Sequence, residues 1–527
     1  MNQKLEQGQV VELEITDLNT SGEGVGRHRG QVIFVPNTVT GDRLNAKIIQ
    51  SKAKFARGKI EKLLTPSAYR IRPNCIVADK CGGCQWQHID PSYQREAKRQ
   101  QVVQALQRIG GFEDVQVQPI LHAVNSLNYR NKSTYPLARS NTGQVQAGYY
   151  RQGSHKLVNL NQCPVQDERL HPLLKEVKHD IEQRGWSIYD EKNHQGKLRH
   201  LSLRIGKNTG EILLTLISTN QNLSGIEEQA KSWLDRYPGL VGVCLNINRD
   251  RTNAILGKET YTIIGKPYLR EIFAGIELHI AADTFFQINT GTAELLFQAL
   301  VKQLDLTGNE KIIDAYCGIG TFSLPLARKV KQVWGIEVHP ASIQQAKNNA
   351  SLNQIHNVAF YAGKVKHSLQ QIGETPDILV LDPPRKGCEN EVISSIMKLQ
   401  PSRIAYISCK PPTPRTSSGR SNASSLPAKY ASSCSRASFS SANASGAWAL
   451  RHATPVIAPS SEMIVRSPTG VGKESSAITG LSAAPLQPGD WRGGLHQWRS
   501  WPRAPDSPCL RPSIARHPRR NPPPAAP

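Results

Sequence analysis

The chain has 527 residues, enough for several domains with buried cores of their own. Its first residues are polar and charged, and no apolar run approaches the ~20 residues that a membrane-spanning helix needs, so we expect a cytoplasmic protein without a secretory signal or membrane anchor. The 65 Lys and Arg against 42 Asp and Glu give a net charge of +23, which favours a polyanionic partner.

Residues 1–64 are predicted to form a small β domain. Three segments have strand composition, and glycine-rich turns separate them: Val10–Ile15, Gln31–Val35 and Leu44–Ile49. Short strands with basic loops are typical of an OB-like barrel, which is a common platform for RNA. A small barrel that only packs on a neighbouring domain is the alternative.

A cysteine cluster follows. Cys75, Cys81 and Cys84 lie close together in the sequence, with two glycines between the last two, and Cys163 lies much further on. We expect reduced thiols in a protein without a secretory signal, and thiolates are soft ligands for zinc or for an iron–sulfur cluster. Zinc sites usually combine two short C-x2-C spacings. The pattern therefore favours an iron–sulfur cluster, with a closed zinc site as the alternative.

The segment that continues to residue 270 is predicted to be mainly β. A helix is expected first, from Tyr93 to Ile109, and we expect the surrounding 91–118 segment to pack on the last domain. Further on, Leu198–Ile205 and Glu211–Ile217 are predicted to form a hairpin. This β segment opens with Tyr129-Arg-Asn-Lys132 and includes Ala147-Gly-Tyr-Tyr-Arg151. Cationic and aromatic side chains interleaved on a sheet favour binding of phosphates and unpaired bases, with solvated strand faces as the alternative.

From about residue 271 strands and helices alternate, which is typical of a doubly wound, Rossmann-like α/β sheet. Lys311–Ser323 has the pattern of a strand, a glycine loop and a helix start, and the next strand ends in Glu337. An acid there accepts hydrogen bonds from the ribose hydroxyls of an adenosine. The loop lacks the G-x-G-x-x-G pattern, and we expect its Asp314 to repel a pyrophosphate. S-adenosylmethionine, a cationic nucleoside without phosphates, therefore fits better than NAD.

Two later strands deliver further chemical groups. One ends at Asp382, followed by two prolines, and the next apolar run ends at Cys409. Together with Tyr316 and Glu337, these residues fall at the carboxyl ends of predicted parallel strands, where ligands bind in open α/β sheets. The alternative for Cys409 is a buried strand-end cysteine without a chemical role.

Together these motifs resemble the RumA-like branch of the RNA uracil-5-methyltransferases, over about residues 1–411. The resemblance is carried by Thr284-Phe-Phe-Gln-Ile-Asn289, Asp314-Ala-Tyr-Cys-Gly-Ile-Gly320, Asp382-Pro-Pro-Arg-Lys-Gly387 and Ser408-Cys-Lys-Pro411. It implies a multidomain α/β protein, with a TRAM domain at 1–64, an iron–sulfur and RNA-binding domain at 65–270 and a methyltransferase domain at 271–411.

The resemblance also implies roles for single residues. The S-adenosylmethionine contacts fall on Gln287, Tyr316, Glu337 and Asp382, the ligands of a [4Fe–4S] cluster on Cys75, Cys81, Cys84 and Cys163, and the nucleophile on Cys409. The implied reaction methylates C5 of a uridine through a covalent adduct between the thiol and C6, with cytosine as the alternative target. Related tRNA enzymes generally lack the TRAM and cluster parts, so 23S rRNA is favoured over tRNA. We expect a monomer without an obligate protein partner.

The composition changes abruptly after Pro411. Residues 411–527 contain 21 serines and 18 of the chain's 34 prolines, and 14 basic against 4 acidic residues give them +10 of the net charge. Such a segment buries little core, so residues 412–527 are predicted to be disordered. A basic tail that binds RNA nonspecifically is one interpretation.

Out-of-frame translation is the other interpretation of this segment. In the family that the chain resembles, the sheet continues past the nucleophile to a histidine and to the glutamate that serves as the base, and no such continuation follows Pro411. The chain would then bind RNA and S-adenosylmethionine without completing turnover.

Overall fold

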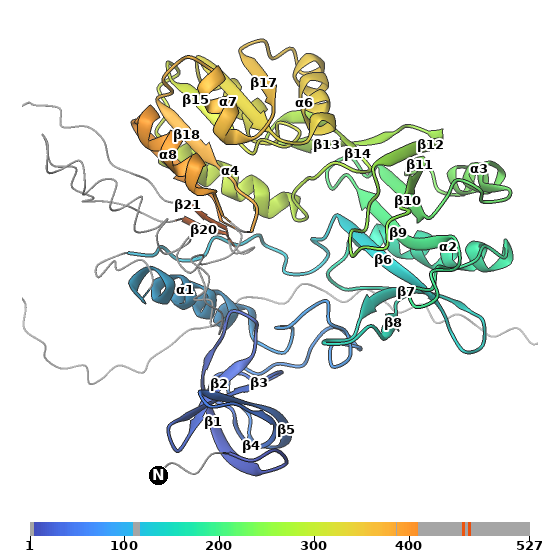
Figure 1. Cartoon of the computed structure of the whole chain (residues 1–527), viewed down its shortest axis with the longest axis vertical. Coiled ribbons are helices and arrows are strands. Elements are labelled where there is room, and N and C mark those ends of the chain that lie inside the picture. The colour runs from blue at the N-terminus through green and yellow to red at the C-terminus, as the bar shows by residue number, and fades with distance from the viewer. Residues whose placement is uncertain (1–4, 109–115, 386, 409–455, 459–461, 465–527) are drawn as a thin grey trace, which may run out of the picture. The chain divides into compact units, whose positions relative to one another are not determined.

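The computed structural model describes residues 5–108, 116–385, 387–408, 456–458 and 462–464 (Figure 1). Three folded regions follow one another along the chain: a closed barrel, a seven-stranded sheet and a five-stranded parallel sheet. The predicted multidomain α/β architecture is confirmed in this outline. Among the described residues, no helix is both long and apolar enough to cross a membrane.

The N-terminal region is a closed barrel of five strands. They are β1 (Val10–Leu18), β2 (Gly24–His28), β3 (Gln31–Val35), β4 (Arg43–Ser51) and β5 (Phe55–Thr65). Alternate residues of β1 point inward, so that Leu13 and Ile15 are buried in the barrel core. The barrel confirms the prediction. Only β1, β3 and β4 were predicted, because glycines in β2 and charged residues in β5 weaken their strand composition.

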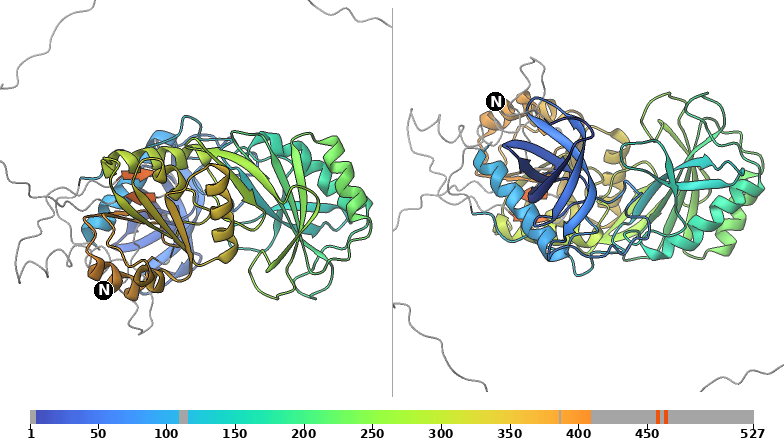
Figure 2. Two further views of the ribbon diagram at one scale, coloured as in Figure 1. Left: turned by 90° about the horizontal axis from the view of Figure 1, so that it is seen from above. Right: turned by 90° about the horizontal axis from the view of Figure 1, so that it is seen from below.

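The central region is built on a seven-stranded sheet in the order β12-β11-β10-β9-β6-β7-β8. Its elements are α1 (Pro91–Arg108), β6 (Lys132–Arg139), β7 (Val145–Tyr150), β8 (Leu157–Asn159), η1 (Glu168–Leu170), α2 (His171–Gln183), β9 (Leu198–Ile205), β10 (Ile212–Ser218), α3 (Ile226–Arg236), β11 (Leu240–Ile247) and β12 (Glu259–Gly265). Helices α2 and α3 lie side by side on the sheet (Figure 2), with Trp233 of α3 fully buried. The predicted hairpin is confirmed as the antiparallel pair β9 and β10.

Helix α1 agrees with the predicted helix to within two residues at its N-terminus. Few of its residues are buried, and its side-chain amides make long-range contacts: Gln101 Nε2 donates to the carbonyls of Leu18 and Asn19, both at 3.2 Å. These hydrogen bonds connect α1 to the end of β1. The packing of this segment on the last domain stays a prediction.

The last domain contains a parallel sheet in the order β17-β16-β15-β18-β19. Its elements are β13 (Tyr268–Phe273), β14 (Ile276–Ala281), α4 (Thr290–Leu304), β15 (Lys311–Ala315), α5 (Ser323–Ala327), β16 (Gln332–Glu337), α6 (Pro340–Leu352), β17 (Val358–Ala362), α7 (Val365–Gln371), β18 (Ile378–Leu381), α8 (Asn390–Leu399) and β19 (Arg403–Tyr406). The chain runs outward from β15 to β17 and then returns to β18 beside β15. The strand order thus reverses between β15 and β18, where ligands of such sheets bind.

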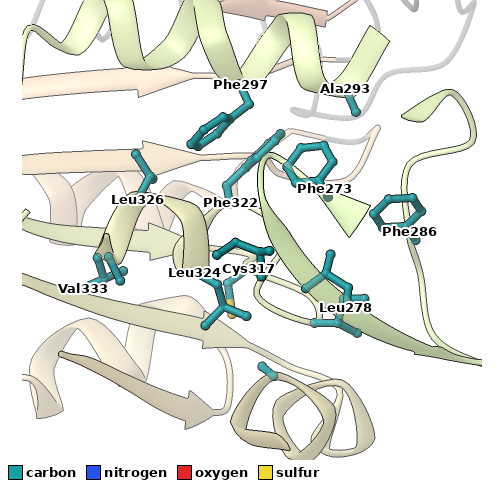
Figure 3. Packing of buried hydrophobic residues seen from close by; sticks show 14 of the residues in the cluster. Phe273, Leu278, Phe286, Ala293, Phe297, Cys317, Phe322, Leu324, Leu326 and Val333 are labelled. Carbon is teal, nitrogen blue, oxygen red and sulfur yellow. The ribbon is translucent and has the colours of Figure 1, made fainter. Parts of the chain in front are cut away.

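Helices cover both faces of this sheet. Successive residues of a strand point to opposite faces, and in β15 apolar residues are buried on both. Ile312 of β15 packs with α4, α5 and α6, whereas the next residue, Ile313, packs with α7 and α8. On the first face an aromatic group joins the helices to the β13–β14 hairpin (Figure 3): Phe273 lies 6.0 Å from both Phe297 and Phe322, ring centroid to ring centroid. The predicted alternation of strands and helices is therefore confirmed.

Beyond residue 408 the structure describes two short antiparallel strands, β20 (Val456–Ala458) and β21 (Glu462–Ile464). The sequence predicted disorder throughout residues 412–527, and for these two strands that prediction is wrong. Each is only three residues long in a segment rich in serine and proline, so its average composition concealed them. The rest of the predicted disordered tail lies outside the described residues.

Candidate functional site

One cleft brings together the four residues that the sequence assigned to a nucleoside cofactor. Tyr316 follows β15, Glu337 ends β16 and Asp382 follows β18, so the three stand at the carboxyl ends of neighbouring parallel strands. These residues and Gln287 all line the same cleft. Its position is the one at which open α/β sheets bind ligands.

Glu337 is held by backbone amides on both sides. Its Oε2 accepts a hydrogen bond from Gly318 N–H at 3.3 Å, and its Oε1 accepts one from His339 N–H at 2.9 Å. Gly318 and Gly320 have φ of +55° and +84°, a region that glycine enters freely, and this lets the loop after β15 turn toward β16. The half-buried carboxylate retains accepting capacity toward the cleft, which suits the hydroxyls of a ribose.

Tyr316 has an unusual backbone for a non-glycine residue. Its φ is +71°, in the left-handed region, and such strain is concentrated at functional sites. Its hydroxyl donates to Cys388 Sγ at 3.8 Å. Burial raises the pKa of the Tyr316 phenol well above its usual range, so the side chain stays neutral. It offers the cleft an uncharged aromatic ring.

Asp314 does not act as the sequence predicted. Strand β15 continues to Ala315, so Asp314 still obeys the strand alternation, and its side chain lies in the interior with an exposed fraction of 1%. Its Oδ2 accepts from Ser323 Oγ at 2.5 Å, and burial raises the pKa of the carboxyl to about 7. The expectation that this carboxylate repels a pyrophosphate from the loop is therefore wrong, since the group does not face the cleft.

Gln287 lies on an irregular loop, residues 282–289, between β14 and α4. Phe286 is buried and packs edge-on against Phe273, with ring centroids 6.1 Å apart (Figure 3). Its neighbour Phe285 is 64% exposed and lines the cleft. One ring thus anchors the loop, and the other is available to stack on a base. The sequence analysis did not single out Phe285, although two adjacent aromatic residues before a candidate ligand-binding Gln were a usable signal.

The four cysteines of the predicted cluster interact electrostatically. Cys163 is buried, while Cys75, Cys81 and Cys84 are half-buried. Burial raises the pKa of the Cys81 and Cys163 thiols, and the Cys84 and Cys75 thiols raise both pKa values further. Gly83 N–H donates to Cys81 Sγ at 3.4 Å.

These thiols do not form a site for a single metal ion. In the described part of the chain, no group of three or more His, Cys, Asp or Glu side chains is placed to hold one. The described residues therefore show neither the predicted cluster nor its alternative, a closed zinc site. The [4Fe–4S] cluster stays a prediction.

Cys409, the predicted nucleophile, lies outside the described residues. The strand that precedes it, β19, pairs in parallel with β18, and Tyr406 stands opposite Leu381. Strand β19 therefore ends at the same edge of the sheet as the strand that delivers Asp382.

Known proteins resemble this chain over most of its length. The family model described as tRNA (Uracil-5-)-methyltransferase matches residues 94–418, and the TRAM domain model matches residues 4–60. An uncharacterised RNA methyltransferase of Nostoc sp. is 60% identical over 404 residues, which cover 77% of this chain and 88% of that protein. One of Synechocystis sp. is 58% identical over 408 residues, with the same coverage of 77% and 88%.

A solved structure has a similar fold. It is the crystal structure of Pyrococcus abyssi tRNA (uracil-54, C5)-methyltransferase in complex with S-adenosyl-L-homocysteine, with a TM-score of 0.64 and 22% identity. The match covers 86% of this chain and 100% of that chain. At this identity the likeness shows the fold alone.

Proposed function

Because this chain belongs to the tRNA (uracil-5-)-methyltransferase family, we propose that it transfers the methyl group of S-adenosylmethionine to C5 of one uridine in 23S rRNA. The observation that carries the proposal is the cleft lined by Gln287, Tyr316, Glu337 and Asp382 at the strand ends of a parallel sheet. An N-terminal TRAM domain accompanies this site and supports an RNA substrate.

The proposed binding of S-adenosylmethionine uses the chemistry of the cleft. The Glu337 carboxylate accepts hydrogen bonds from the ribose hydroxyls, and its two backbone donors hold it in place for that purpose. The neutral ring of Tyr316 packs against the nucleoside. The carboxylates of Glu337 and Asp382 in one cleft suit a cationic sulfonium better than a pyrophosphate.

The proposed reaction begins with the Cys409 thiolate. It adds to C6 of uracil, because C5 is a poor nucleophile until that addition turns the ring into an enolate. C5 then displaces S-adenosylhomocysteine from the methyl group, so that a C5–methyl bond forms as the sulfur–methyl bond breaks. A base removes the C5 proton, and the electron pair expels the thiolate from C6. The uridine must leave its stack to expose its face, and Phe285 stands in the cleft to receive an unstacked ring.

A transfer assay with radiolabelled S-adenosylmethionine tests this proposal. We expect label in fragments of 23S rRNA and none in tRNA transcripts, and we expect Cys409→Ala to abolish transfer. Label in tRNA alone would favour the alternative, a tRNA uridine C5-methyltransferase. Binding of S-adenosylmethionine without transfer to any RNA would favour the other alternative, a protein that binds RNA and cofactor but does not complete turnover. Nucleoside mass spectrometry of the labelled RNA separates uridine from cytidine as the target.

We further propose that Cys75, Cys81, Cys84 and Cys163 hold a [4Fe–4S] cluster. The Cys75 and Cys84 thiols raise the pKa of the Cys81 thiol and of the Cys163 thiol, and bound iron would offset this repulsion between thiolates.

Metal analysis of anaerobically purified full-length protein checks this second proposal. We expect about four iron and four acid-labile sulfide per chain, and Cys81→Ser and Cys163→Ser should each lower both. Cys244→Ser is the matched control, since Cys244 is a buried strand cysteine in the central sheet. Protein that carries zinc, or neither iron nor sulfide, would contradict the cluster.

A further inference from the structure

The loop that carries Gln287 depends on the central sheet for its conformation. Residues 282–289 belong to no helix or strand, so their backbone groups need other partners. Arg204 of β9 contacts the start of the loop: its Nη1 donates to the carbonyl of Ala281, the last residue of β14, and its Nη2 donates to that of Thr284, both at 2.8 Å. A residue of the central sheet therefore fixes the start of the loop.

Asn131, directly before β6, fixes the other end of the loop. Its backbone N–H donates to the Ile288 carbonyl at 2.9 Å, and its side-chain Nδ2 donates to the Gln287 carbonyl at 2.8 Å. The same Nδ2 donates to Thr290 Oγ1 at 3.0 Å. Asn131 is 2% exposed. One buried side chain thus holds the backbone of Gln287 and the first residue of α4.

A buried carboxylate orients this contact. Thr290 Oγ1 donates to Glu271 Oε2 at 3.1 Å, and a hydroxyl has only one proton to donate. Toward Asn131 the hydroxyl must therefore act as the acceptor. Glu271 is fully buried and accepts in turn from the amides of Lys207 at 2.6 Å and Asn208 at 2.9 Å. Asn131 therefore donates to Thr290, and Thr290 donates to Glu271. The direction of both hydrogen bonds is fixed.

We propose that Asn131 is a positioning residue for Gln287. It fixes the loop backbone on the central sheet, so that the Gln287 side chain stands in the cleft before S-adenosylmethionine arrives. Without this anchor, binding must also order the loop, and that loss of entropy weakens affinity. Asn131 directly follows Tyr129 and Arg130, which line the same cleft, so the anchor joins the candidate RNA-binding segment to the cofactor loop. The inference rests on the proposed contact of Gln287 with S-adenosylmethionine.

The test compares the dissociation constant of S-adenosylmethionine among full-length variants without RNA. We expect Gln287→Ala to weaken binding about tenfold, as the loss of one well-placed hydrogen bond does, and Asn131→Ala to weaken it to a similar degree. Thr290→Val keeps the volume of the side chain and removes the hydroxyl, so it should weaken binding in the same direction. If Asn131→Ala fails to fold, Thr290→Val still tests the same hydrogen bond.

Asn246 provides the matched control. It is a fully buried asparagine of the central sheet whose Nδ2 donates to the Gly257 carbonyl at 3.1 Å and to Thr260 Oγ1 at 2.9 Å. Asn246→Ala should lower the melting temperature as Asn131→Ala does, yet leave the dissociation constant unchanged. A purely structural role for Asn131 predicts that the two variants behave alike, and that result would overturn the inference.

The Gln287→Ala variant separates this inference from the proposed function. If Gln287→Ala weakens binding and Asn131→Ala does not, the positioning role is wrong and the proposed cofactor contact stands. If Gln287→Ala leaves binding unchanged, the proposed contact of Gln287 is wrong, and the inference about Asn131 fails with it.

Discussion

Asp314 is a buried acid whose charged state depends on folding. Burial raises the pKa of its carboxyl from 3.8 to about 7, so the folded chain keeps the group protonated at pH values where the unfolded chain ionises it. Its contribution to stability is therefore complete below about pH 4 and is lost as the pH rises through about 7. Between pH 5 and pH 8 the loss is on the order of 3 kcal/mol.

Asp314→Asn removes this titration and keeps an acceptor for the hydroxyl of Ser323. We expect the wild type to lose more stability between pH 5 and pH 8 than Asp314→Asn does. Urea unfolding of both proteins at the two pH values measures the difference, and all other titrating groups cancel in the comparison. Equal losses in both proteins would show that the pKa of Asp314 is not raised.

At the scale of residues, the sequence predicted where a residue lies along a strand better than whether its side chain faces the cleft. Tyr316, Glu337 and Asp382 were placed at strand ends, and all three line one cleft, because an apolar run that ends in a polar residue marks the edge of a sheet. The sequence analysis counted Asp314 as part of the glycine loop, whereas it lies inside strand β15. β15 includes Ala315, and helices cover both faces of its sheet, so a side chain at position 314 lies in the core.

At the scale of elements, strand β16 depends on a glycine in its middle. A Cβ at Gly335 would lie 2.5 Å from Cδ1 of Phe360 and 2.9 Å from Sγ of Cys317, which starts the glycine loop. Gly335→Ala must therefore push β17 and that loop aside. We expect it to destabilise the protein by about 1–3 kcal/mol and to weaken S-adenosylmethionine binding, as measured by thermal unfolding and titration.

Gly291 of α4 provides the control for this substitution. A Cβ at Gly291 would meet only Asn289 Oδ1, at 3.9 Å, so the helix has room for it. Gly291→Ala should stabilise the protein by about 0.5–1 kcal/mol, because alanine loses less backbone entropy in a helix. A Gly335→Ala variant as stable as Gly291→Ala would show that β16 tolerates a side chain there.

Strong local patterns made elements predictable, and long-range pairing did not. The β9–β10 hairpin follows from two alternating apolar runs around a short turn, and it was predicted. The pairing of β6 with β9 joins segments separated by helix α2 and was not predicted, because no local pattern specifies the partner of a strand.

At the scale of the whole molecule, the arrangement that matters most for the cleft was invisible in the sequence. Asn131 and Gln287 are 156 positions apart, and each belongs to a motif that the sequence analysis noted separately. Their contact depends on how the central sheet and the last domain pack, and a single sequence carries no signal of such packing.

The whole chain also makes a prediction about the end of the reaction. The proposed mechanism needs a base after methyl transfer, and in the family that the chain resembles this base follows the nucleophile by some forty residues. Residues 412–527 carry a different composition, with two glutamates, Glu462 and Glu474, in unrelated contexts. If no residue of this segment replaces that base, the C5 proton stays in place and the thiolate cannot leave. We therefore expect labelled RNA to remain attached to the protein on a denaturing gel.

Two variants decide what such an adduct means. Cys409→Ser should form none, because the adduct requires the thiolate. A chimera in which the corresponding segment of the Nostoc relative replaces residues 412–527 should release methylated RNA if that segment carries the base. Protease treatment should convert the labelled band of the original chain into a short peptide–RNA species. If the original chain instead releases free 5-methyluridine in RNA and leaves no adduct, a base is present elsewhere in the chain, and Glu462 and Glu474 become the first residues to substitute.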